Sequence, residues 1–308
     1  MNLDFWISVA VLAGIYGVFT LGLQLNAGLT GILNFGQAGF MAIGAYAYGL
    51  LVVNAQWNPW AAVAAAVLAA VAAALLVGLS SLRLRTDYFA IATIAFAEMV
   101  RYTLQNAQFS GGNQGVLGYD TAWRGFADAV SSRLSQADFG GHSQLPLLVL
   151  VWAVFVVLII VLTLLERTPW GRILKALRED EDAVSALGKN ALSYKLQSLA
   201  ISAAIAAVAG VFVALNITYL YPSVFDPNFT FFGYAMLVIG GLGSFAGTAL
   251  GGLLFWALLE GTRFVDLALS AGQQASLRFI LVGVALIVLN RVRPQGLLGD
   301  RAGMVAGR

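Results

Sequence analysis

Two pairs of ionisable side chains stand inside otherwise apolar segments of this sequence. Glu98 with Arg101 and Glu260 with Arg263 share the pattern Glu-x-x-Arg. Side chains three residues apart lie on one face of a helix, so each pair can form an ion bridge. Ionisable residues within a membrane segment often line a path for a solute. We take Glu98 and Arg101 as candidate path residues, while a neutral pair that only joins two helices is the alternative.

A third polar group surrounds a run of glycines near the N-terminus. Its side chains are Gln24, Asn26, Thr30, Asn34 and Gln37, and its glycines are Gly28, Gly31, Gly36 and Gly39. Glycines loosen a helix, and amides can satisfy the backbone groups that are freed. The group is either a polar turn between two spans or a broken helix near a translocation path. On the second interpretation, Asn34 and Gln37 are candidate path residues.

Residues for catalysis are almost absent. The sequence has no cysteine and one histidine, His142. No phosphate-binding motif of the form G-x-x-x-x-G-K-[ST] occurs, and the only Gly-Lys pair, Gly188-Lys189, lacks the upstream glycine and the hydroxyl. We therefore expect no enzyme activity, no cofactor, no metal and no nucleic-acid partner, which favours transport.

The composition is that of a membrane protein. Sixty per cent of the residues are hydrophobic and 10% are charged, whereas soluble domains average about 25% charged. The mean hydropathy is +0.83. Apolar runs of about eighteen residues or more recur, and they do not alternate as barrel strands do. The sequence predicts an all-α fold, a polytopic bundle of transmembrane helices.

The sequence predicts nine hydrophobic segments in a single transmembrane domain over 1–308. Residues 231–245 are short for a membrane core of about 30 Å, so this segment is a full span, a broken helix or a re-entrant one. The segments are 5–26, 31–53, 59–79, 88–106, 145–165, 195–220, 231–245, 246–263 and 276–290.

The distribution of basic residues indicates how the protein is oriented in the membrane. If the segment 166–195 lies in the cytoplasm, so do Arg83, Arg85 and the C-terminal tail, and that side then holds twelve of the seventeen Lys and Arg. Cytoplasmic loops of membrane proteins carry such an excess of basic residues. The N-terminus and the loop 107–143 are then external.

The segment 166–195 holds eleven of the 32 charged residues. Ile173, Ala176, Leu177, Val184 and Leu187 recur within it at helical spacing, so one face is apolar and the rest is charged. This pattern predicts an amphipathic helix within 172–188 that docks on a partner. An ordinary solvated loop is the alternative.

Several motifs together resemble the inner-membrane permeases of the branched-chain amino acid ABC importer family, and the M-type of its two paired permeases more than the H-type. They follow one another over nearly the whole chain. The motifs are GLTGILNFGQAGF (28–40), AIGAY (42–46), LRLRTDYFAI (82–91), AEMVR (97–101), GGNQG (111–115), RTPWGR (167–172), EDED (179–182), SALG (185–188) and RPQGLLG (293–299).

The resemblance implies a type II ABC importer-like architecture in a bacterial inner membrane. An M-type and an H-type permease form a heterodimer, two cytoplasmic ATP-binding subunits hydrolyse ATP, and an external binding protein delivers the substrate. The coupling loop 166–195 then contacts an ATPase. The coupling residues expected from the resemblance and the helical pattern are Arg172, Leu177, Val184, Leu187 and Gly188.

The resemblance is not complete, and it leaves the substrate open. Thr86 stands where the family usually has glycine, and Lys189 stands where an aliphatic residue is common. Both positions are cytoplasmic and leave the assignment as a permease in place. We expect neutral, above all branched-chain, amino acids as substrates. A urea or amide permease of the same superfamily and an ATP-independent secondary carrier are the alternatives.

Overall fold

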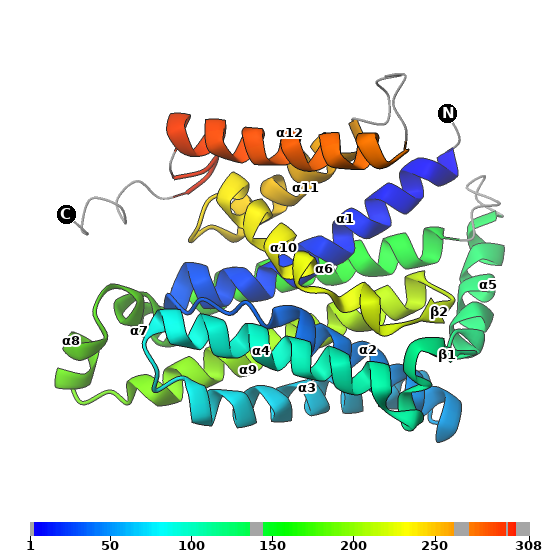
Figure 1. Ribbon diagram of the computed structural model, residues 1–308, viewed down its shortest axis with the longest axis horizontal. Coiled ribbons are helices and arrows are strands. Elements are labelled where there is room, and N and C mark those ends of the chain that lie inside the picture. The colour runs from blue at the N-terminus through cyan, green and yellow to red at the C-terminus, as the bar shows by residue number, and fades with distance from the viewer. Residues whose placement is uncertain (1–2, 136–143, 262–270, 294, 300–308) are drawn as a thin grey trace.

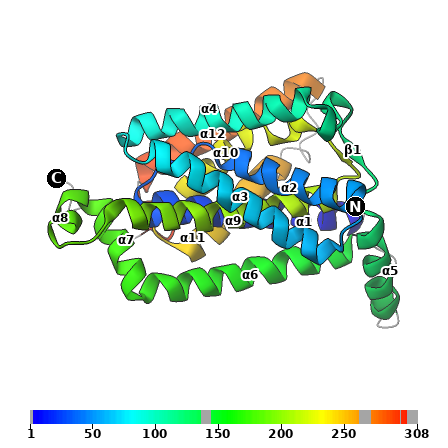
Figure 2. The ribbon, with the colours of Figure 1, turned by 90° about the horizontal axis from the view of Figure 1, so that it is seen from below.

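A computed structural model describes residues 3–135, 144–261, 271–293 and 295–299. Most helices run along the long axis of the molecule and form one bundle (Figure 1). Seen from below, α6 (Leu145–Arg167) lies along one side of the bundle and α4 (Thr86–Asn106) along the opposite side (Figure 2). The observed fold is therefore all-α, as the sequence predicts.

The remaining elements fall into long helices and short connecting pieces. The long helices are α1 (Leu3–Leu23), α2 (Gln37–Asn54), α3 (Pro59–Ser81), α9 (Ala191–Asn216), α10 (Pro227–Gly240), α11 (Phe245–Gly261) and α12 (Ala271–Val292). The shorter pieces are the π-helix η1 (Gln24–Thr30), α5 (Thr121–Ser135), α7 (Pro169–Glu179), α8 (Glu181–Ala186), the 3₁₀ turns η2 (Gln108–Ser110), η3 (Gly112–Gln114) and η4 (Pro222–Phe225), and the antiparallel strands β1 (Val116–Leu117) and β2 (Tyr219–Leu220).

Five helical segments in the described chain are long and apolar enough to cross a membrane, and a bent pair of helices would make a sixth. The five are 3–30, 37–54, 59–81, 145–167 and 191–216. Helix α4 contains Asp87, Glu98 and Arg101 and is not among them. The count of nine spans is thus not confirmed, although each predicted segment overlaps a helix.

The bent pair covers the two predicted segments 231–245 and 246–263. Helix α10 has 14 residues and is about 21 Å long, which is less than a membrane core. The segments 222–240 and 245–259 meet at 114°. Gly241 and Gly243 have φ of 108° and 89° in the turn, a conformation that favours glycine. The short segment is one arm of a helical hairpin.

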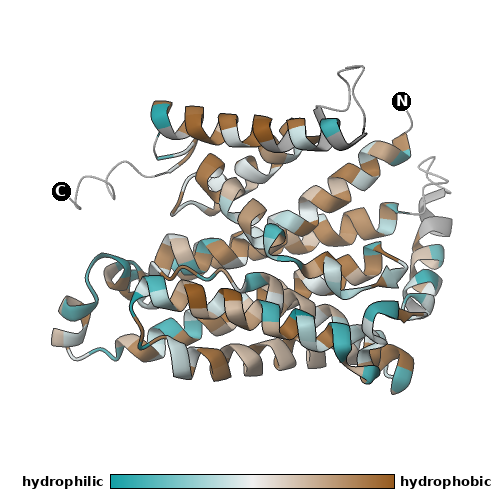
Figure 3. Ribbon diagram, viewed as in Figure 1, coloured by the Kyte–Doolittle hydropathy of each residue, from teal (hydrophilic) through white to brown (hydrophobic). Residues whose placement is uncertain are grey.

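Burial separates central helices from peripheral ones. In an 18-residue window, 67% of α1 with η1, 67% of α2 and 72% of α9 are buried, against 28% of α3 and 22% of α6. Without water in lipid, exposed side chains there must be apolar, and α3 and α6 meet this condition (Figure 3). Helices α1, α2 and α9 therefore form the core, and α3 and α6 have the surfaces for lipid.

The two ends of the bundle differ, as the predicted orientation requires. Helices α7 and α8 and the end of α12 lie at one end, and the start of α1, helix α5 and the β1–β2 pair lie at the other (Figure 1). Which end faces the cytoplasm stays a prediction from the basic residues.

Tyr119 joins the loop after β1 to the segment before β2. Its hydroxyl donates a hydrogen bond to the Ile217 carbonyl, and burial, and to a lesser extent Asp120, raises the pKa of this hydroxyl.

Candidate functional site

The predicted docking helix is divided into two helices. Thr168 begins α7 by accepting the N–H of Gly171, and Pro169 follows in the first turn. Asp180 ends α7 in an extended conformation and caps α8 by accepting the N–H groups of Asp182 and Ala183, at 2.9 and 3.0 Å. The prediction of one helix within 172–188 is wrong in this respect, because the acidic run supplies a strong N-cap in its middle.

Helix α7 is fixed to the membrane helices. Leu174 is fully buried and Leu177 is 5% exposed. Lys175 forms an ion pair with Glu166 of α6 at 2.7 Å, and the Trp170 indole donates to Gln197 of α9 at 2.8 Å. These contacts join the loop to the helices before and after it.

Helix α8 and the turn after it present a different surface. Val184 is 5% exposed and packs inward, whereas Leu187 is 80% exposed. Gly188 has a φ of +76°, and a Cβ built there would meet no atom within 4 Å. Arg172 is also exposed. The five predicted coupling residues thus divide into two buried anchors, Leu177 and Val184, and three that face outward.

Arg178 connects α7 to two irregular segments. Its Nη1 donates to the carbonyl of Gly28 in η1. A Cβ on Gly31 would lie 3.0 Å from Arg178 Cγ, and one on Gly243 in the α10–α11 turn would lie 3.5 Å from Arg178 Nη1. The π-helical end of the first span, the hairpin turn and the coupling loop therefore meet at one side chain, which the sequence analysis did not single out.

Gln24 strengthens the same junction. With its amide oxygen turned toward the hairpin, it accepts the N–H groups of Gly243 and Ser244, each at 2.6 Å. Two backbone donors of the turn are satisfied in this way, which matters where water is absent. The polarity of Gln24 is visible in the sequence, but its partner 219 residues later is not.

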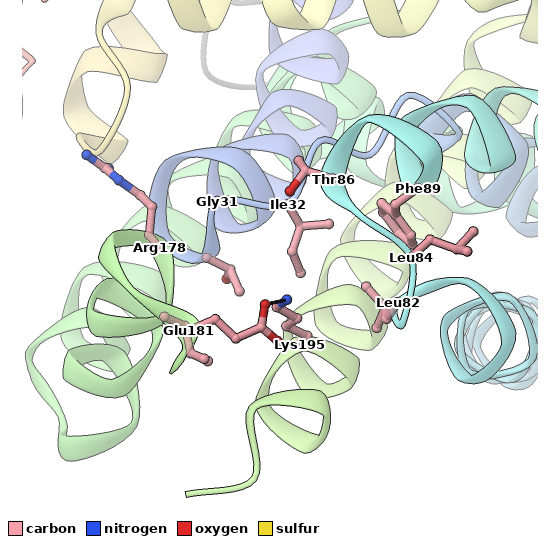
Figure 4. Close-up of a pocket in the computed structure, with 11 residues that line it drawn as sticks. Gly31, Ile32, Leu82, Leu84, Thr86, Phe89, Arg178, Glu181 and Lys195 are labelled. Atoms are coloured by element: carbon pink, nitrogen blue, oxygen red, sulfur yellow. Dashed lines mark hydrogen bonds and ion pairs between the residues drawn. The ribbon is translucent and has the colours of Figure 1, made fainter. Parts of the chain in front are cut away.

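A small cavity of about 100 Å³ lies beside this junction (Figure 4). It separates the end of η1 from the segment 82–89 and from the start of α9. Glu181 and Lys195 form an ion pair at its edge, and Arg178 extends from it toward the hairpin turn (Figure 4). Such a gap gives α7 and α8 room to shift against η1.

Asn34 and Gln37 lie in a closed polar network. Both are fully buried, and Asn34 Nδ2 donates to Gln37 Oε1 at 2.8 Å. Gln37 Nε2 donates to the Ser202 carbonyl at 3.1 Å, and Ser202 Oγ donates to Gln37 Oε1 at 3.0 Å. Helix α1 continues into the π-helix η1 as far as Thr30, and the non-helical residues 31–36 join this span to α2, which begins at Gln37. The irregular region is therefore a π-helical end of the first span followed by a polar turn between two spans. That Asn34 and Gln37 line a path stays a prediction.

Glu98 and Arg101 form the expected ion pair, with Arg101 Nη2 2.6 Å from Glu98 Oε2. Their side chains are 26% and 17% exposed on α4, and the guanidinium lies 4.6 Å from the centre of the Tyr102 ring. The pair therefore reaches the surface of the subunit, unlike the amides. Arg263 lies outside the described residues, so the second pair is not described.

Long apolar helices, a first span that ends in a π-helix, a helical hairpin and a polar loop docked at one end are the features of a multi-pass membrane protein. Residues 5–289 match the profile of the family described as branched-chain amino acid transport system / permease component. The chain belongs to that family. It is a transport permease and a multi-pass membrane protein, as the resemblance predicted.

Individual relatives agree with this assignment. The high-affinity branched-chain amino acid transport system permease protein LivM of Escherichia coli is 34% identical over 305 residues, covering 95% of this chain and 69% of the relative. A probable LivM permease of Methanocaldococcus jannaschii is 26% identical, covering 98% and 95%. The LivH permease of E. coli is 26% identical, covering 94% and 92%. No solved structure matches the chain.

Proposed function

We propose that this chain is the LivM-like subunit of an ATP-driven importer for branched-chain and other neutral amino acids. The similarity to LivM permeases, which match along nearly the whole chain, is the observation that carries the proposal. A LivH-like permease is the expected partner, since relatives of both kinds match. An external binding protein and two ATP-binding subunits complete the importer.

The coupling loop supports the ATPase part of the proposal. Helix α8 projects from the end of the bundle (Figure 1). In the turn that follows it, the large apolar side chain of Leu187 is 80% exposed. A buried apolar anchor within a charged rim is the usual composition of a binding surface. The ATPase contacts this surface, and α7 transmits the movement through Arg178.

The two pairs of candidate path residues have different roles in this proposal. Glu98 and Arg101 lie part-exposed on α4, where a path between two permeases can reach them. Asn34 and Gln37 act indirectly, because their hydrogen bonds hold α2 against α9 beside the π-helical end of the first span.

Reconstitution of the complete importer tests the function. Both permeases and both ATPases are placed in proteoliposomes that contain ATP. The binding protein and either labelled L-leucine or labelled urea are then added outside the vesicles. We expect ATP-dependent uptake of leucine and none of urea. Uptake of urea alone would reject the amino-acid assignment, and leucine uptake without ATP would favour a secondary carrier.

A further inference from the structure

A second cavity lies at the opposite end of the bundle from the coupling loop. Its volume is about 410 Å³, within the ~300–1,000 Å³ that small-molecule sites occupy. Helices α1, α9, α10 and α11 and the turn η4 form its walls. None of the candidate path or coupling residues lines it.

Among the described residues that line this cavity, Asp226 is the only charged one. It precedes Pro227 at the start of α10, and its carboxylate caps no backbone N–H there. Asn228 Nδ2 donates to Asp226 Oδ2 at 3.1 Å, and no ion pair within the described chain involves Asp226. A partly buried carboxylate without a cation is complementary to a ligand with one positive charge.

Hydrogen-bond donors lie in the same lining. They are the side-chain amides of Asn216 and Asn228. The amide of Asn228 donates one hydrogen to Asp226 and has a second. A group bound beside these amides gains most if it accepts a hydrogen bond, so the ligand should also carry an acceptor, such as a carboxylate.

The rest of the wall is apolar and rigid. Tyr16 stacks on Phe229 with the ring centres 3.9 Å apart, and Trp256 meets Tyr16 edge-on at 5.2 Å. Leu12 and Val213 supply aliphatic surface from α1 and α9. Such a wall favours a branched aliphatic group, because burial of apolar surface is stabilising and the aromatic side chains lose little freedom on binding.

We propose that this cavity binds a neutral L-amino acid as a zwitterion, on the external half of the permease. Asp226 receives the α-ammonium group, the side-chain amides of Asn216 and Asn228 donate to the α-carboxylate, and the aliphatic side chain lies against Leu12 and Val213. The proposal rests on the amino-acid import proposed above. It places one recognition step in this subunit, in addition to recognition by the binding protein.

Equilibrium binding of labelled L-leucine to the purified complete importer, without the binding protein, tests the site. We expect Asp226→Asn to weaken binding about tenfold or more, since a charge-assisted hydrogen bond is lost. Asp226→Glu should retain more of the affinity. The matched control is Asp128→Asn, an exposed acid on α5 at the same end, which should leave binding unchanged.

Two further measurements keep the test independent of folding. Leu12→Trp should fill the cavity and weaken leucine binding, whereas Leu68→Trp on the exposed face of α3 should not. Isoamylamine and 4-methylpentanoate each lack one charged group of leucine and should compete at least about tenfold more weakly than leucine. Size-exclusion profiles and basal ATPase activity show that the variants assemble.

Measurements of leucine uptake and of leucine binding distinguish the proposed import function from the proposed binding site. Leucine binding that is absent from the wild-type complex, or unchanged in both Asp226→Asn and Leu12→Trp, overturns the site even where ATP-driven leucine uptake is normal. Absence of leucine uptake by the wild-type importer rejects the proposed function, whereas leucine binding that still depends on Asp226 would retain the site.

Discussion

Helices α7 and α8 come from one charged stretch of the chain but differ in what they contact. Helix α7 buries Leu174 and Leu177 and connects to η1 through Arg178, while α8 ends in the exposed Leu187 and Gly188. The amphipathic pattern that runs through both therefore has two purposes. The first helix anchors the loop to the permease, and the second is available to another protein.

The anchored helix contacts the least regular parts of the membrane bundle. Arg178 reaches a π-helix and lies close to a glycine turn, and π-segments inside helices are often functional. Regular helices move as rigid bodies, whereas such segments can change shape locally. A push on α8 should therefore be transmitted through α7 to η1 and the hairpin. The predictions below separate docking from anchoring.

The largest effect is expected at the docking surface. Leu187→Ala should weaken binding of the ATPase subunits by about 2 kcal/mol or more, as for loss of a central apolar anchor. Gly188→Asp should uncouple substrate-stimulated ATPase activity from uptake, because it places a negative charge on the exposed docking surface. Gly188→Asn is the matched control, since asparagine has the same shape and also tolerates the φ of +76° but carries no charge.

Glu179→Gln should change little, because rim charges contribute little to affinity. Normal ATPase binding and uptake in both Leu187→Ala and Gly188→Asp would show that α8 is an ordinary solvated segment and does not bind the ATPase.

A smaller effect is expected at Arg178, which connects α7 to η1. Arg178→Ala removes the donor to the Gly28 carbonyl and should lower uptake by about tenfold, from the loss of one charge-assisted hydrogen bond. ATPase subunits should still bind, because α8 is unchanged. Arg178→Lys, which keeps the charge, should restore part of the uptake. If Arg178→Ala instead releases the ATPase with uptake per bound complex intact, docking and anchoring are not separate.

The buried amides should affect stability rather than the transport step. Asn34→Leu leaves Gln37 without one partner and should lower the free energy of unfolding by roughly 1–3 kcal/mol. Thermal unfolding of the purified complex measures this change. Uptake per assembled complex should stay near the wild-type value. A large fall in uptake with an unchanged unfolding temperature would assign Asn34 to the path after all.

The smallest effect is expected at the boundary between the two helices. Asp180→Ala removes the cap of α8 and should destabilise that helix by about 1 kcal/mol. ATPase affinity should fall only a few-fold, with leucine binding to the permease unchanged. Asp180→Ser, which keeps a capping oxygen, should behave like the wild type. An equal loss in both variants would show that the charge, rather than the cap, is what matters.

The sequence predicted the parts of the fold that depend on local chemistry. Apolar runs predict helices in lipid because backbone polar groups must be satisfied within the segment. Local patterns also indicated the irregular region around Gly28 and Gly31, the Glu98–Arg101 pair and the short segment 231–245. Each signal is contained within a few helical turns, so no distant residue was needed.

The tertiary structure decided which distant segments of the chain pack against one another. Whether Asn34 and Gln37 face a path or Ser202 depends on how α2 packs on α9, which no local pattern specifies. Leu177 and Leu187 have the same polarity in the sequence, yet only the packing of α7 under η1 buries the first and leaves the second exposed. Periodicity reports one face of a helix, but contacts between distant segments determine what that face meets.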